Sequence, residues 1–123
     1  MAVVARDERG AVTAHVAVVP AVVALFFLVV QVGLWFHGRT VATAAAQHGL
    51  ETARVAHGSA GAGEATVHEF VGQVGGVELR SVSVQRSVTE VTVTVNGDAV
   101  TVLPFFDVPI TVTVEGPVER IVE

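Results

Sequence analysis

The sequence VAVVPAVVALFFLVV, from Val16 to Val30, decides the fold of this chain, because it is an unbroken apolar run. The uncharged region around it is longer, and no formally charged residue occurs from Ala11 to Phe36. About 26 residues at roughly 1.5 Å each make a helix of about 39 Å, which exceeds a bilayer core of about 30 Å. A soluble core helix is the alternative, but such helices rarely run this long without a polar face. We therefore predict that residues 11–36 cross a membrane once.

Composition limits what else the chain can do. It has 123 residues, of which 51% are hydrophobic, and this content suggests membrane residence. The net charge of -5 argues against a nucleic-acid partner. This length leaves room for one small domain beside the membrane segment, which excludes most multi-domain enzymes. The sequence has no cysteine, so disulfides, thiolate chemistry and cysteine-based zinc or iron–sulfur sites are excluded.

The end of the apolar run has the residues of a membrane interface. Trp35 and Phe36 are followed by His37, Gly38 and Arg39, so an aromatic pair and then a charge lie where an interfacial belt is expected. A cleaved secretory signal would need a shorter apolar run and a small-x-small site. Slightly more arginine precedes the span than follows it, which favours a cytoplasmic N-terminus. The larger region follows the span, so we expect a cell-membrane protein with an extracellular C-terminal domain.

Three residues interrupt the apolar character of the span. Pro20 removes one backbone hydrogen bond, so we expect a bend or a loosened turn there. His15 is an ionisable residue within the span, which is either functional or an imidazole that snorkels toward the cytoplasmic headgroups. Gln31 lies near the outer end, where a polar side chain costs less than at the centre.

The region from residue 37 to 76 is predicted to be mainly helical. Residues 40–56 are rich in alanine and free of proline, so the membrane helix is expected to continue into water with a narrow surface that suits helix packing. Residues 58–63 predict a flexible glycine-rich loop. Apolar residues at helical spacing in 64–74 then predict a short amphipathic helix that ends at Gly75-Gly76.

From residue 77 to 123 the apolar period changes to two, which predicts an antiparallel β domain. Strands are expected at 77–84, with an irregularity near Ser81, at 91–95 and at 110–114. Asn96-Gly97 predicts a two-residue type I′ hairpin that places Val93 opposite Val100 and Val91 opposite Val102.

Between the last strands, the apolar bend from Leu103 to Pro109 contains prolines that prevent ladder bonding. Phe105 and Phe106 are expected to fill the small core, and the alternative is an exposed tip that contacts a partner or lipid. The predicted organisation is a leader at 1–10, a membrane helix at 11–36, a helical stalk with its loop and short helix at 37–76, and the β domain at 77–123.

No motif supports catalysis or a bound cofactor. The sequence contains no phosphate-binding glycine loop, no H-E-x-x-H and no nucleophile elbow. The pairs His37 and His48, and His57 and His68, are each eleven apart, which on a helix is about 16 Å and too far for one metal. We expect no enzyme activity, no cofactor and no metal site.

Segments at both ends of the chain resemble one family. The segment Arg9–Pro20, the sequence QVGLW at 31–35 and the alanine-rich stretch after it are similar to TadE-like minor pilins, the pseudopilins of the tight-adherence (Tad/Flp-type, type IV-related) pilus system. Three C-terminal segments look like actinobacterial members of this family: Thr92–Val95, Leu103-Pro104 and Gly116–Arg120. The resemblance implies a pilin-like α+β fold, with a long anchoring helix followed by a small antiparallel sheet.

The resemblance also implies how the protein is processed and assembled. A prepilin peptidase would cleave after Gly10 and leave Ala11 as the mature N-terminus; the alternative is an ordinary signal anchor. His15 stands where the family usually has glutamate, which neutralises the terminal amine of a neighbouring subunit. His15 and Pro20 are therefore the expected assembly residues, since the family also has an early proline in its helix.

The sequence thus predicts a minor pilin whose partners are the lipid bilayer, other pilin or pilus-assembly subunits and the peptidase. The alternative is an unprocessed bitopic protein whose β domain binds an extracellular partner. Replacement of the family glutamate by His15 favours a protein that stays in the membrane over one that enters the filament.

Overall fold

The computed structural model describes residues 2–55, 58–103 and 106–119. It contains two helices and one three-stranded antiparallel sheet in the order β1-β2-β3. The helices are α1 (Ala2–Arg54) and α2 (Ala60–Val74), and the strands are β1 (Val77–Arg86), β2 (Glu90–Ala99) and β3 (Pro109–Pro117). This arrangement confirms the predicted α+β class.

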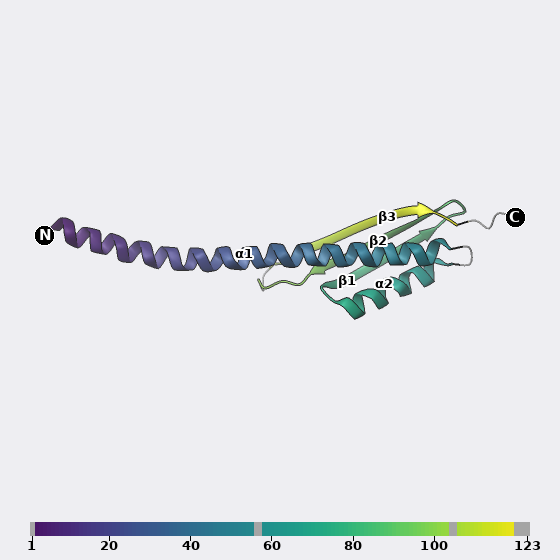
Figure 1. Cartoon of the computed structure of the whole chain (residues 1–123), viewed down its shortest axis with the longest axis horizontal. Helices are drawn as coiled ribbons and strands as arrows, with labels where there is room; N and C mark the ends of the chain where they lie inside the picture. The colour runs from purple at the N-terminus through teal and green to yellow at the C-terminus, as the bar shows by residue number, and fades with distance from the viewer. Residues whose placement is uncertain (1, 56–57, 104–105, 120–123) are drawn as a thin grey trace.

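Helix α1 runs along most of the molecule, while α2 and the sheet lie beside its C-terminal half and its N-terminal half projects alone (Figure 1). The predicted continuation of the apolar helix is therefore confirmed as far as Arg54. Small side chains on α1 form one side of the core, with Ala42, Ala45, Ala46 and Ala53 fully buried. Valines of the sheet form the other side, with Val91, Val93 and Val95 equally inaccessible.

The predicted strand irregularity is confirmed. The register between β1 and β2 shifts between Leu79 and Ser81, so Arg80 has no paired residue on β2. The shift keeps Val77 and Val84 both buried although they are seven positions apart and would otherwise face opposite sides of the sheet, which a bulge allows because it inserts one extra residue. The third predicted strand is also confirmed, with Ile110 and Val112 buried in β3.

The predicted turn at Asn96-Gly97 is wrong. Strand β2 continues through both residues to Ala99, and Gly97 pairs with Leu79 on one side and with Ile110 on the other. Gly97 is needed for a different reason, because a Cβ there would lie 2.5 Å from the carbonyl oxygen of Glu78. This glycine therefore permits close strand contact at the bulge, and no left-handed backbone is involved.

The connection between β2 and β3 also departs from the predictions. Val100 and Val102, which were expected in a strand opposite β2, lie outside the sheet with 45% and 38% of their surface exposed. Phe106 is 61% exposed, so its predicted role in filling the core is wrong, and Phe105 lies outside the described residues. The exposed-tip alternative holds for Phe106.

The predicted loop at 58–63 is largely the beginning of α2. Ser59 caps the helix, since its hydroxyl oxygen accepts a hydrogen bond from the Ala62 amide at 3.1 Å. Gly63 is buried where α2 meets α1, and a Cβ there would lie 3.0 Å from both the Ala53 Cβ and the Gly49 carbonyl oxygen. The glycines thus allow close helix packing, while the predicted end of α2 at Gly75-Gly76 is confirmed by their positive φ angles of 76° and 92°.

Candidate membrane and assembly site

The apolar part of α1 has no protein covering it. Every residue from 14 to 29 is exposed, including Val16 at 67%, Phe26 at 64% and Val29 at 63%. Because consecutive residues of a helix point in different directions, apolar side chains surround the helix on all sides. Within the described residues, this is the one helix that is long and apolar enough to cross a membrane. Its surroundings must be lipid or other apolar helices.

The predicted interfacial belt forms a compact cluster at the end of this exposed segment. The rings of Trp35 and Phe36 meet edge to face, with centroids 5.1 Å apart. The Arg39 guanidinium lies 5.6 Å from the centroid of the Trp35 ring, within the range of a cation–π contact. Aromatic rings and a cation placed one turn beyond an apolar helix are typical of a membrane–water interface.

Gln31 joins the end of the apolar run to the connection after β2. Its side chain is 7% exposed, its Nε2 donates to the Val100 carbonyl oxygen at 3.2 Å, and its Oε1 accepts from the Val102 amide at 3.0 Å. Both halves of the side-chain amide are therefore paired with backbone that has left the sheet. The sequence analysis missed this role, although an amide within an apolar run signals a need for buried hydrogen-bond partners.

The four residues predicted for processing and assembly all lie on the projecting part of α1. Gly10 and Ala11 belong to its continuous helical backbone, and His15 and Pro20 follow with exposed side chains. The helix continues unbroken through Pro20 and curves gently in this part (Figure 1). The structure therefore places these residues along one helix, away from the sheet.

The stalk part of α1 has one buried face and one open face. The open face includes Phe36, Arg39, Thr40, Thr43 and Ala44, which border a shallow surface hollow. Thr40 and Thr43 donate their hydroxyl hydrogen bonds to the carbonyl oxygens of Phe36 and Arg39, at 2.9 and 2.8 Å. Since the helix itself satisfies these hydroxyls, the open face presents small groups that a second helix can approach closely.

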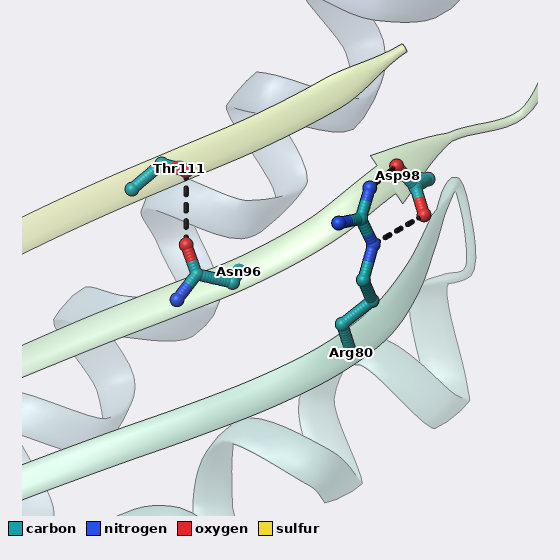
Figure 2. Close-up of polar contacts among 4 residues, drawn as sticks. All are labelled: Arg80, Asn96, Asp98 and Thr111. Carbon is teal, nitrogen blue, oxygen red and sulfur yellow. Dashed lines mark hydrogen bonds and ion pairs between the residues drawn. The ribbon is translucent and has the colours of Figure 1, made fainter. Parts of the chain in front are cut away.

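The sheet has a polar outer surface, part of which is shown in Figure 2. Arg80, the bulge residue, donates through Nε to Asp98 at 2.7 Å and through a second N–H to the other carboxylate oxygen. The hydrogen bonds from Arg80 hold the pKa of Asp98 below its ordinary value, and the same pair raises the pKa of Arg80. Asn96 bridges all three strands, since it donates to Ser81 at 3.2 Å and accepts from Thr111 at 2.9 Å.

These polar groups are engaged with one another, and they form no recognisable catalytic arrangement. In the part of the chain that the structure describes, no three histidine, aspartate or glutamate side chains gather as a metal site would require. Among the described residues, the surfaces that are left exposed are mainly apolar or small: the apolar run of α1, the open face of the stalk and Val100, Val102 and Phe106 after β2.

A comparison with protein families identifies the segment that carries these features. Residues 16–51 match the model of the family described as TadE-like protein. This segment is TadE-like. It begins in the exposed apolar run and ends in the stalk, so it contains Pro20, Gln31 and the interfacial belt, while Gly10, Ala11 and His15 precede it. No curated protein and no solved structure gave a significant match to the chain.

Proposed function

We propose that this chain is a TadE-like minor pilin, a membrane-anchored structural component of a Tad pilus. The observation that carries the proposal is that the TadE-like segment, residues 16–51, contains the exposed apolar run of α1 and the open face of the stalk, while the other face of the stalk packs against α2 and the sheet. An exposed apolar helix that continues into an open stalk face of small groups suits contact with lipid and with neighbouring helices. The proposed role is thus anchoring and association, without catalysis.

In this proposal the membrane helix begins at Ala11 after a prepilin peptidase has removed residues 1–10. Cleavage inside a helix requires local unwinding, and Gly10 favours it because glycine weakens a helix by about 1 kcal/mol relative to alanine. The leader would lie in the cytoplasm and the sheet outside the cell. The stalk would place its open face, from Phe36 to Ala44, against the helices of other subunits.

The first experiment determines the mature N-terminus. The full chain is expressed in membranes with and without its cognate prepilin peptidase, and the intact mass and N-terminal peptide are measured. We expect a product that begins at Ala11 only when the peptidase is present, and Gly10→Leu should block its formation. An intact leader in the presence of an active peptidase would instead support the unprocessed, membrane-anchored binding module.

The second experiment addresses His15. A neutral imidazole can accept a hydrogen bond from the terminal amine of a neighbouring subunit, but it cannot cancel the charge of that amine in an apolar surrounding. His15→Glu should therefore preserve or increase co-purification with pilin subunits after mild detergent extraction. His68→Glu, which adds the same charge on the exposed surface of α2, serves as the matched control. Reduced association of the His15 variant alone would show that the histidine has a role of its own.

A further inference from the structure

The described part of the connection between β2 and β3 carries large apolar side chains that remain exposed. Val100, Val102 and Phe106 are 45%, 38% and 61% exposed, and Leu103 is only half-buried. Figure 1 shows that this connection lies at the end of the sheet that points along α1 toward the N-terminus. Exposed apolar side chains gathered in one connection usually mark a contact surface.

The position of the connection along α1 shows what this surface meets. Gln31 holds the backbone of Val100 and Val102 directly against the last part of the apolar run. From Ala11, where the predicted span begins, to Gln31 is about 30 Å at roughly 1.5 Å per residue, which matches a bilayer core of about 30 Å. The connection is therefore held at the depth where hydrocarbon gives way to headgroups, about one turn of α1 before Trp35 and two turns before Arg39.

The apolar surface of the connection is also continuous with that of the helix. The hydrogen-bonded contact that Gln31 makes with Val100 and Val102 is called the clasp. Val32 and Phe36, which follow Gln31 on α1, are 48% and 59% exposed. Val108 shares a small apolar hollow with Gln31 and Trp35. Asp107 is exposed on the same connection, and an ionised carboxylate keeps its surroundings hydrated. This combination suits the interfacial layer of a bilayer better than its centre.

We propose that the β2–β3 connection is a second membrane contact, in which Val100, Val102 and Phe106 insert into the interface of the leaflet on the side of the sheet. The occupant of this surface is phospholipid. Gln31 makes the insertion rigid, because its two hydrogen bonds fix the depth of the connection relative to the span. The sheet would then have one defined distance from the membrane surface and one defined tilt angle. The inference rests on α1 spanning the bilayer and is independent of cleavage or pilus assembly.

Site-directed spin labelling tests the proposal directly, because the chain contains no cysteine and every introduced cysteine is unique. Nitroxide labels are attached to the full chain at Phe106→Cys, Val102→Cys and, as a control, Val88→Cys. Val88 is 82% exposed in the turn between β1 and β2, at the opposite end of the sheet. A fourth label at Leu25→Cys reports on the span itself.

The labelled proteins are reconstituted at high lipid-to-protein ratio in phosphatidylcholine and phosphatidylglycerol vesicles, and power saturation compares collisions with oxygen and with a water-soluble nickel chelate. We expect labels at 106 and 102 to collide more with oxygen than with nickel, at a depth shallower than that of residue 25, while position 88 shows the reverse preference. If the label at residue 25 lies in lipid but the labels at 102 and 106 lie in water, the inference is wrong while the membrane anchor stands. A span label in water would overturn the membrane anchor as well. Spin–spin broadening at 106 would identify a second copy of the chain as the occupant and would also overturn the inference.

Discussion

The two halves of α1 are one continuous helix, but they relate to the rest of the chain in opposite ways. From residue 14 to 29 large apolar side chains are exposed on all sides, whereas from residue 41 to 53 the buried face consists mainly of alanine and glycine. The first half has apolar surface without any partner, and the second half is already packed against α2 and the sheet. One helix can therefore anchor the molecule and form half of its core, because its exposed apolar run ends before the stalk, where small residues face the sheet and α2.

The comparison also explains why the small domain is stable without disulfides. Alanine and glycine on α1 allow α2 and the sheet to approach its backbone closely, so the valines on the facing elements are almost fully buried. Substitutions in the packed half should therefore change folding, while substitutions in the projecting half should change only how the protein meets its surroundings. The predictions below test this division in order of expected effect.

The largest effect is expected from Ala45→Asp, which would place a carboxylate in the packed core. Ala45 is fully buried, and an unpaired buried charge costs about 3–5 kcal/mol. Gln47→Asp, two residues away on the exposed surface, should change the free energy of unfolding by no more than about 0.5 kcal/mol. Thermal unfolding of the full chain in detergent, followed by near-ultraviolet and far-ultraviolet circular dichroism, measures both.

The projecting half supplies a further control for this comparison. Leu25→Ala removes a side chain that is 59% exposed, so it should leave the unfolding of the packed region unchanged. A loss of stability comparable to that of Ala45→Asp would show that the projecting half also contributes to the core.

The second prediction concerns close contact within the sheet. Gly97→Ala should destabilise the chain by about 1–3 kcal/mol, because the new Cβ would lie 2.5 Å from the Glu78 carbonyl oxygen and 2.8 Å from the Val77 Cγ1 atom. Gly72→Ala is the matched control, since nothing lies within 4 Å of a Cβ there and alanine should stabilise helix α2 by about 0.5–1 kcal/mol. Opposite signs in urea titrations of the two variants would support the assignment of Gly97 to a strand interior.

These glycines show what sequence reasoning could and could not reach. The long apolar helix, the change of period at Val77 and the bulge near Ser81 follow from local patterns, and all were predicted correctly. The Asn96-Gly97 turn was predicted from the same kind of local rule, but the glycine is required by a contact with β1, which a local rule cannot include. Gly63 was assigned to a loop for the same reason, although its role depends on α1.

The candidate site was predictable to a similar extent. The span and its belt were evident because lipid imposes a simple rule on composition, whereas the clasp formed by Gln31 joins residues about seventy positions apart in the sequence. The pattern did place Gln31 near the end of the span. Only the three-dimensional path of the chain after Ala99 shows that its amide is paired there.

The third prediction tests this clasp, where the two halves of α1 meet. Gln31→Leu keeps the size of the side chain but removes both hydrogen bonds, which leaves two partly buried backbone groups unpaired at a cost of no more than about 1–3 kcal/mol. Because these groups lie in a connection, the cost should appear as local opening: hydrogen exchange at the Val102 amide should accelerate by about tenfold or more, while the amides of β2 remain protected. Gln73→Leu, on the exposed surface of α2, should leave the exchange of Val102 unchanged.

The smallest effect is expected on the polar surface of the sheet, at the pair formed by Arg80 and Asp98. Because hydrogen bonds from Arg80 hold the pKa of Asp98 below its ordinary value, the pair stabilises the folded state above the unfolded pKa of about 3.9, and this stabilisation is lost as the pH falls through the lower folded value. Asp98→Asn should therefore lower the unfolding temperature slightly at pH 7 and by progressively less as the pH falls below the unfolded pKa, and added salt should reduce the difference since the pair lies at the surface. Glu69→Gln removes one charge from the exposed surface of α2 and should show no such pH dependence. If the two variants gave the same pH profile, the Arg80–Asp98 pair would contribute nothing beyond net charge, and the bulge would be held by Gly97 and the Asn96 bridge alone.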